Sequence, residues 1–256
     1  MLSEENAFIE RLLAPSFSIN KDDYRIFVDT QNKYTWKVKY RHSDLMIISD
    51  KDISLNITPT LIDFYSIIEK FSDKYPSFVK TFNPFIPASD SPDIIKKMCI
   101  ESAVFNVGPM ASVAGAVCEF LADRLARDNP YLAIENGGDI YIKSPNDITA
   151  GLYVKNRFFK DNLKIKIRKK ILPCGIASSS GTLGHSLSLG KADLAAIVCS
   201  SAILADSAAT AAGNMVKTKD DIEKTIDHFK DFKEIEGIVL IKDEKIGLFG
   251  NIELVR

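Results

Sequence analysis

Strand-like and helix-like hydrophobic periods follow one another irregularly along this chain, and that order restricts its fold more than any other feature. Alternating apolar and polar residues at 24–28 and 34–40, and a short apolar run at 45–48, predict three strands. Residues 61–71 then change to a helical period with a single apolar stripe. Because strands and helices are intermixed without a repeating strand–helix–strand unit, the sequence predicts an α+β fold rather than a doubly wound one.

The remaining elements continue this mixed pattern. Ser91 and Pro92 mark a helix start, because serine can cap a helix and proline fits its first turn. Further helices are predicted at 110–127, 203–215 and 220–229, and further strands at 131–135, 140–143, 150–154, 163–172, 193–199, 237–241 and 245–249. Residues 1–256 are expected to form one domain, since single cores reach roughly 250–300 residues. The N-terminal meander (24–49) and the C-terminal hairpin (237–249) are expected to pack on the common part.

Charge and composition exclude several classes of function. Lys and Arg number 33 and Asp and Glu 34, and the resulting net charge of -1 argues against broad nucleic-acid binding, which needs a basic surface. The N-terminus lacks the basic and apolar regions of a secretory signal, and no run of about 18 apolar residues predicts a membrane span. The sequence therefore predicts a cytoplasmic protein with neither a nucleic-acid nor a membrane partner. Its four cysteines form no CxxC pair, which argues against zinc.

The stretch 174–185 is the richest in groups that could carry chemistry. Its glycines and hydroxyl residues indicate a loop at a strand end, whose N–H groups and side chains suit a phosphate or another anion. The anion-binding residues expected there are Ser178, Ser179, Ser180 and Gly181. His185 could act as a general acid or base, although a lone histidine is more often structural. Cys174 could be a nucleophile activated by neighbouring N–H groups, or simply the end of a buried strand.

A second candidate is the four-residue turn between the strands predicted at 131–135 and 140–143. It consists of Asn136, Gly137, Gly138 and Asp139. Its two glycines can take the positive φ that a tight turn requires. The ordinary interpretation is a hairpin, in which Asn136 and Asp139 bond the local backbone.

The third candidate is the pair Asp206 and Thr210. On a helix these residues are i and i+4, so their oxygens project from one face. A carboxylate beside a hydroxyl makes half of a site for a hard cation such as Mg²⁺, which takes further ligands from water and substrate phosphates. The alternative interpretation is structural, with Asp206 helping to cap the helix and Thr210 packing.

Three blocks of the sequence, in this order and at these distances, resemble the ApbE-type proteins, the FAD:protein FMN transferases once called thiamine biosynthesis lipoproteins. Residues 106–111 through 132–140 resemble their Asp-Leu-Gly-Gly helix and the Gly-Gly-Asp turn after it. Residues 175–181 resemble their Ala-Thr-Ser-Gly loop, and residues 204–211 their Ala-Asp-Ala-x-x-Thr-Ala helix. The resemblance covers a little under half of the chain.

This resemblance implies a mixed α+β domain, related to the T-fold, with largely antiparallel sheets and packed helices. It implies Mg²⁺ held by Asp206 and Thr210, with FAD or FMN bound near the turn and the serine loop. The departures are specific. Ser112 stands where the family has a Lys, and the segment after His185 is shorter and lacks Asp-Pro-x-Thr. The chain thus resembles a cytoplasmic branch that differs from the exported flavin transferases.

Three functions remain open from the sequence. The first is a Mg²⁺-dependent binding or transfer enzyme for a flavin nucleotide or a related pyrophosphate-bearing molecule, with His185 as a catalytic residue. The second is a sulfur-handling or redox protein that uses Cys174. The third is a relative that binds its ligand without catalysis. In each case the expected partner is a small anionic molecule, and a homo-oligomer is an open alternative.

Overall fold

The computed structural model describes residues 33–125, 128–154, 156–159, 163–180 and 190–255. The strand predicted at 24–28 lies outside them. The described strands are β1 (Tyr34–Tyr40), β2 (Ser43–Ser49), β3 (Leu132–Asn136), β4 (Asp139–Lys143), β5 (Ile148–Leu152), β6 (Leu163–Ile167), β7 (Cys174–Ser179), β8 (Leu194–Cys199), β9 (Ile235–Lys242), β10 (Lys245–Gly250) and β11 (Ile252–Val255). The described helices are α2 (Ser54–Lys74), α3 (Pro76–Lys80), α4 (Asp93–Val104), α5 (Val113–Leu125), α6 (Ala202–Met215) and α7 (Asp221–Phe229), with 3-10 turns η2 (Pro109–Ser112) and η3 (Lys169–Ile171).

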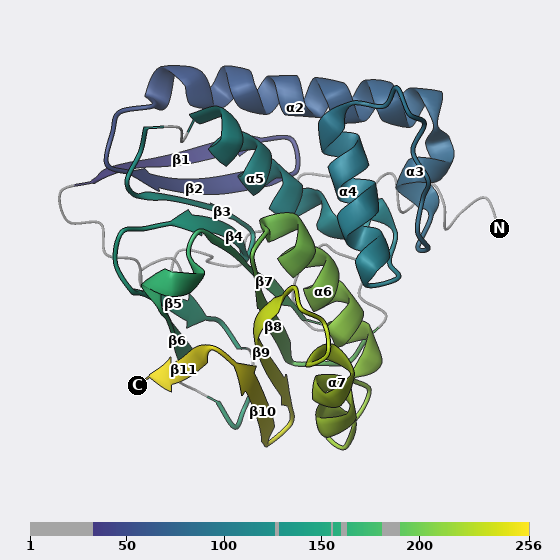
Figure 1. Ribbon diagram of the computed structural model, residues 1–256, viewed down its shortest axis with the longest axis vertical. Helices are drawn as coiled ribbons and strands as arrows, with labels where there is room; N and C mark the ends of the chain where they lie inside the picture. The colour runs from purple at the N-terminus through teal and green to yellow at the C-terminus, as the bar shows by residue number, and fades with distance from the viewer. Residues whose placement is uncertain (1–32, 126–127, 155, 160–162, 181–189, 256) are drawn as a thin grey trace.

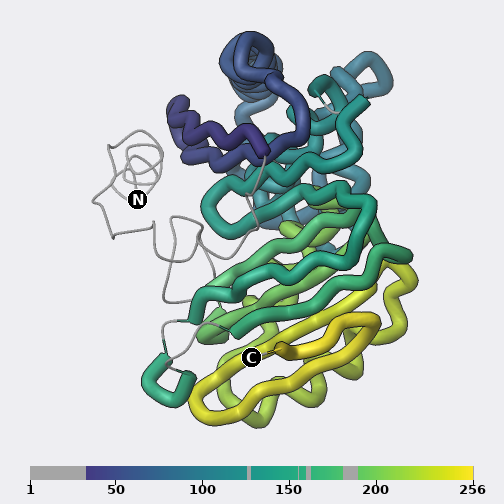
Figure 2. The backbone as a smooth tube through the Cα atoms, turned by 90° about the vertical axis from the view of Figure 1, so that its left-hand side faces the viewer, coloured from purple at the N-terminus to yellow at the C-terminus, as the bar shows by residue number. Residues whose placement is uncertain are grey.

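A single large sheet organises these elements. Its eight strands run in the order β1-β2-β3-β4-β7-β8-β9-β10, and every neighbouring pair is antiparallel. A second sheet of three antiparallel strands has the order β11-β6-β5. Figure 2 shows the large sheet running from the purple β1–β2 hairpin to the yellow β9–β10 hairpin. This architecture confirms the predicted α+β class with largely antiparallel sheets.

The helices cover one face of the large sheet, and the small sheet covers the other (Figure 1). Helices α2, α4 and α5 pack on the β2–β3 part, whereas α6 and α7 pack on β7, β8 and β9. On the opposite face, residues of β5, β6 and β11 pack against the large sheet. The long helix α2 illustrates why the helices lie there: its apolar stripe is buried at Ile57, Leu61, Phe64, Ile68 and Phe71.

Small residues bring α6 directly onto β7. A Cβ atom placed at Gly175 would lie 2.3 Å from the Cα of Ala202 and 2.4 Å from the carbonyl oxygen of Ser201. Further along, a Cβ at Gly213 would lie 3.2 Å from the Oγ of Ser179. The helix therefore follows the strand from Ala202 above Gly175 to Gly213 beside Ser179. This contact corrects one prediction, because residues 174–179 form a central strand rather than a loop.

The structure differs from the sequence predictions at other points as well. The strand predicted at 163–172 ends at Ile167 and is followed by the 3-10 turn η3, where Asp147 Oδ1 accepts the N–H of Lys169 at 2.9 Å. The helix predicted at 110–127 begins as the 3-10 turn η2 and becomes α-helical at Val113. Helix α4 begins after Pro92 without a side-chain cap, so Ser91 does not cap it. Strand β11 was not predicted.

No single helix among the described residues is both long and apolar enough to cross a membrane. Helix α4 and residues 109–125 meet the length and composition test only when taken together, and they are bent by 99° relative to each other.

The contact between α6 and β7 predicts a large penalty for any side chain at Gly175. We expect Gly175→Ala to lower the free energy of unfolding by about 3 kcal/mol, because the methyl group would overlap backbone atoms of α6. Gly137→Ala is the control: its Cβ would meet nothing within 4 Å, so only its φ of 69° costs stability, about 1 kcal/mol. Urea denaturation measures both values. A Gly175→Ala variant as stable as Gly137→Ala would contradict this packing.

Candidate functional site

The turn between β3 and β4 supplies the first group of predicted site residues. Gly137 and Gly138 have φ angles of 69° and 116°, the left-handed region that glycine tolerates. The N–H of Gly138 donates to Oε1 of Glu135 at 2.8 Å. A Cβ at Gly137 would meet no atom within 4 Å. The main chain of this turn is therefore accessible to a ligand.

Asn136, the first residue of the predicted turn, connects two hairpins. Its Oδ1 accepts the N–H of Asp44 at 3.3 Å, and its Nδ2 donates to Oγ of Ser43 at 3.4 Å. Its side chain is buried, and Ser43 in turn contacts the hydroxyl of Tyr65 on α2 at 2.9 Å. Asn136 therefore ties the β3–β4 turn to the β1–β2 hairpin. Its contact with a ligand stays a prediction.

Asp139 and Asp206 approach each other from different elements. Asp139 begins β4 and alternates with Ile140, whose side chain packs toward the small sheet, so Asp139 lies on the helix-covered face. Asp206 lies on α6, and its Oδ2 accepts the N–H of Gly115 of α5 at 2.9 Å. The charge of Asp206 is the strongest one acting on Asp139. The two residues thus lie near each other where β4, α5 and α6 come together.

Burial is the main cause that raises the pKa of both carboxyl groups. Desolvation by the surrounding protein raises the pKa of Asp206 to about 7, against the opposite effect of hydrogen bonds from the start of α5. The pKa of Asp139 is raised well above its ordinary value by burial first, and then by the negative charges of Asp206 and Glu135. A hydrogen bond from the backbone of Ser178 acts in the opposite direction. A positive charge placed between these groups would be strongly stabilised.

Thr210 lies one turn beyond Asp206 on α6, and both residues keep partial exposure. Their i and i+4 spacing therefore projects both side chains from the same side of the helix, as predicted. Asp206 also forms a cap, but at the start of α5 rather than of its own helix. Cation binding by this pair stays a prediction.

The serines of the predicted anion loop do not share one face. Ser179 lies on the helix-covered face with Ala177, next to Gly213 of α6. Ser178 alternates with it and shares the opposite face with Ile176. Only the backbone of Ser178 reaches the carboxylate of Asp139. The structure therefore brings Asp139, Asp206 and Ser179 to the helix-covered face of the large sheet. The side chain of Ser178 lies on the opposite face, which the small sheet covers.

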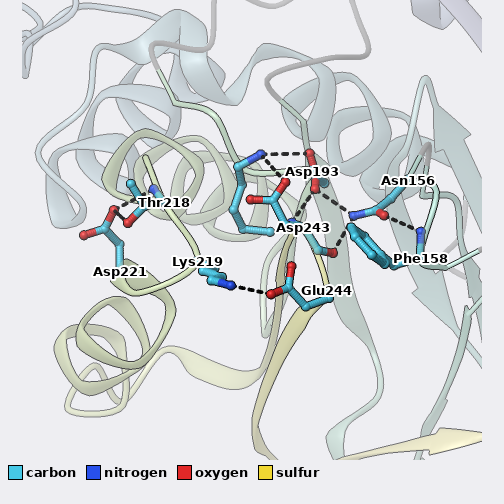
Figure 3. A network of polar contacts seen from close by, with 9 residues as sticks. Asn156, Phe158, Asp193, Thr218, Lys219, Asp221, Asp243 and Glu244 are labelled. Carbon is cyan, nitrogen blue, oxygen red and sulfur yellow. Dashed lines mark hydrogen bonds and ion pairs between the residues drawn. The ribbon is translucent and has the colours of Figure 1, made fainter.

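Ser180 follows the end of β7, and Gly181 and His185 lie outside the described residues. The chain returns at Gly190 and enters β8 through Asp193. Figure 3 shows how Asp193 is fixed: its Oδ2 accepts from the N–H of Asp243 and from Nδ2 of Asn156, both at 2.7 Å. Lys242 lies 3.4 Å from the other carboxylate oxygen. Asp193, which precedes β8, is therefore held by Asn156, Lys242 and Asp243.

Cysteine chemistry finds little support in this environment. Cys174 begins β7 with no exposed surface, and burial raises the pKa of its thiol to about 12. The pKa of Cys118 is also raised well above its ordinary value, by burial and then by the charges of Asp139, Glu135 and Asp206. Its Sγ donates to the backbone oxygen of Asp139 at 3.4 Å. A raised pKa favours the protonated thiol over the activated thiolate considered for Cys174, whose catalytic role stays a prediction.

Glu119, a carboxylate that sequence analysis did not select, caps the start of α6. Glu119 of α5 is buried, and its Oε2 accepts the N–H of Ala202 at 2.8 Å and of Ile203 at 3.3 Å, the first residues of α6. Asp206 of α6 accepts from Gly115, near the start of α5. Each helix therefore caps the N-terminus of the other. A single charged residue inside the otherwise apolar stretch 113–122 was the available signal for Glu119.

Ser201, the N-cap residue of α6, lies between two carboxylates. Its Oγ is hydrogen-bonded to Glu119 at 2.8 Å and also to Glu101, and it accepts from the N–H of Ile203 at 3.1 Å. A hydroxyl carries one hydrogen, so it cannot donate to two ionised carboxylates. Burial is the first cause that raises the pKa of Glu101, and the charge of Glu119 raises it further. The raised pKa of Glu101 favours its protonated form, which would allow Glu101 to donate to Ser201 while Ser201 donates to Glu119.

Two solved structures share this fold. The flavin transferase ApbE from Vibrio cholerae matches with a TM-score of 0.57 and 10% identity, over 85% of this chain and 96% of that chain. The flavinyl transferase ApbE of Pseudomonas stutzeri, in its apo form, matches with a TM-score of 0.52 and 10% identity, over 85% and 93%. The chain therefore has an ApbE-like fold, and at this identity the likeness extends to the fold alone.

The chain belongs to the family described as AbpE bacteria, whose model matches residues 25–234. A UPF0280 protein of Methanococcus vannielii is 36% identical over 225 residues, which cover 86% of this chain and 91% of the relative. A UPF0280 protein of Methanocaldococcus jannaschii is 35% identical over 195 residues, covering 74% and 79%. These findings confirm the resemblance to ApbE-type proteins.

The reciprocal capping predicts that Glu119 is required for stability. We expect Glu119→Ala to lower the free energy of unfolding by about 2 kcal/mol or more, because it removes the acceptor for two buried N–H groups and the partner of Lys97. Glu119→Gln keeps an acceptor oxygen and should lose less. Chemical denaturation of the three proteins provides the comparison, and equal stability of all three would refute the capping role.

The contacts of Glu101 predict a pH dependence of stability. Because its pKa is raised on folding, the folded state retains this proton more strongly than the unfolded state does. The stability that Glu101 contributes is therefore complete below its ordinary pKa of 4.5 and is lost as pH rises through the folded pKa. In Glu101→Gln, the free energy of unfolding should fall less steeply with rising pH. Urea denaturation between roughly pH 4 and pH 8 measures this change, because a carboxyl group with a raised pKa titrates in about that range. An unchanged pH profile would contradict the assignment.

Proposed function

We propose that this protein binds Mg²⁺ at Asp206 and Thr210 and uses it to bind the pyrophosphate of a flavin nucleotide, FAD or FMN, or of a related molecule. The observation that carries the proposal is the partly buried carboxylate of Asp206, which lies near Asp139, a second carboxylate on which Glu135 also acts. An anionic pyrophosphate is repelled by this group of charges unless a cation accompanies it. Ligand binding in this site should therefore depend on a divalent cation.

The donor chemistry fits Mg²⁺ in one of its usual forms. Among the described residues, no group of three or more His, Cys, Asp or Glu side chains could hold a metal ion. We therefore do not propose a site in which all ligands of the metal come from the protein. Mg²⁺ is commonly held by one or two carboxylates and completes its shell with water and substrate phosphates. Asp206 and the hydroxyl of Thr210 would supply such a partial set.

The remaining predicted residues have roles that follow from their positions. The open main chain of Gly137 and Gly138 allows close approach of a ligand, since no Cβ covers it. Ser179 adds a hydroxyl on the same face, beside α6. Ser178, Ser180 and Gly181 would contribute mainly through the chain at the end of β7, and His185 would hold or move a proton. When bound, Mg²⁺ would neutralise the phosphate charge.

One observation favours ligand binding, or a different transfer, over standard flavin transfer to a protein. Ser112 stands where the flavin transferases carry a Lys. Its hydroxyl is buried and donates to the carbonyl of Pro109 at 2.7 Å, within its own turn. Transfer requires groups that stabilise charge developing only in the transition state. We therefore propose Mg²⁺-dependent binding of FAD as the function of this site. The second candidate is a protein that binds its ligand without catalysis.

Calorimetric titration with FAD, with and without Mg²⁺, tests the proposal. We expect binding that requires Mg²⁺ and is abolished by Asp206→Asn, which keeps an oxygen for Gly115 but removes the charge. Thr210→Ala should weaken binding without abolishing it, because a hydroxyl is a neutral ligand. Asp147→Asn, which neutralises a partly exposed carboxylate on the small-sheet side, is the matched control and should bind normally. FAD binding that ignores both Mg²⁺ and Asp206→Asn would refute the proposal.

A further inference from the structure

Two carboxylates, rather than one, face the proposed cation position. Asp139 is held from the sheet side, because the backbone of Ser178 on the neighbouring strand donates to its carboxylate. Asp206 is held from the helix side by the N–H of Gly115 at 2.9 Å. Gly115 and Cys118 lie one turn apart on α5 and contact Asp206 and the backbone of Asp139, respectively. Helix α5 therefore places the two residues close together between β4 and α6.

Within the described part of the chain, the charges that act on Asp139 are negative rather than compensating. The charges that act most on Asp139 are those of Asp206 and Glu135, both negative. The hydrogen bonds to the two carboxylates come from backbone N–H groups, which are neutral donors. Two adjacent carboxylates away from water are costly unless a cation or a proton lies between them.

The local backbone indicates that the position of Asp139 is built into the fold. It follows Gly138, whose φ of 116° lets the chain turn sharply into β4. Its own backbone oxygen accepts from the thiol of Cys118 at 3.4 Å, which fixes the start of the strand against α5. The side chain is thus placed by a turn, a strand pairing and a helix contact, as expected for a ligand held by rigid elements.

We propose that Asp139 is a second carboxylate ligand of the divalent cation, so that Asp139 and Asp206 hold it between β4 and α6. This inference rests on the proposed function, because it concerns the same cation. It assigns to Asp139 a metal contact in place of the flavin contact that the resemblance to ApbE-type proteins implied. It also implies that the protein binds the cation before any nucleotide is present, since two charged ligands are available without phosphate.

Binding of Mn²⁺ to the nucleotide-free protein, followed by electron paramagnetic resonance, tests this assignment. We expect the wild type to bind Mn²⁺ and Asp139→Asn to bind it more than about tenfold more weakly, since even loss of an outer-shell partner commonly costs that much. Glu101→Gln is the matched control, because it removes the ionisable group of another part-buried acidic side chain that contacts the start of α6. Its Mn²⁺ affinity should equal that of the wild type.

The outcomes separate this inference from the proposed function. Mn²⁺ affinity lost in Asp206→Asn but unchanged in Asp139→Asn would overturn the role of Asp139 alone. Affinity unchanged in both variants would overturn the cation site itself. Asp139→Ser, which keeps a small polar group without the charge, repeats the test if Asp139→Asn does not fold. As a second readout, the same concentration of Mn²⁺ should raise the melting temperature of the wild type more than that of the folded Asp139 variant.

Discussion

The reciprocal capping of α5 and α6 is the interaction on which the rest of the structure depends. Glu119 accepts from the first N–H groups of α6, and Asp206 accepts from the third residue of α5. Each helix start carries partial positive charge and unpaired N–H groups, so a carboxylate from the neighbouring helix satisfies both needs. The two helices can exchange these contacts only at very short distance, which Gly115 permits: a Cβ there would lie 2.2 Å from the carbonyl oxygen of Ala202.

This constraint also explains where the candidate site lies. Glu119 accepts a hydrogen bond from the start of α6 and forms an ion pair with Lys97, so its role in the helix pair is structural. Asp206 caps with one oxygen and, at the same time, faces Asp139 on β4. The same residue is therefore both a structural cap and the proposed cation ligand. The two interpretations that the sequence left open for Asp206 are compatible, with the cap directed to α5 rather than to its own helix.

Much of the fold could be predicted from local patterns. Strand β1 coincides with the alternating stretch 34–40, and α6 and α7 begin within one residue of their predicted starts. Residues 174–179 were misassigned because their small and hydroxyl residues are typical of loops. Here they are small because α6 lies directly on the strand, as the backbone overlap at Gly175 demonstrates. Tertiary packing thus overrode composition.

The candidate site was predictable only in part, for a related reason. The spacing of Asp206 and Thr210 identified one helix face, and the Gly137–Gly138 turn was correctly placed between two strands. The approach of Asp139 to Asp206 could not be derived, because it depends on the order of β4 and β7 in the sheet and on the crossing of α5 over α6. The opposite faces of Ser178 and Ser179 became visible only once β7 was known to be a strand.

The location of the cation is the most direct test of this account. Crystals grown with Mn²⁺ and FAD allow the metal to be located by its anomalous scattering. The account predicts a single strong peak within coordination distance of the Asp206 carboxylate, with the pyrophosphate of FAD on its open side, beside the Gly137–Gly138 turn. Ordered FAD with no metal peak near Asp206, or a peak held by other residues, would contradict it.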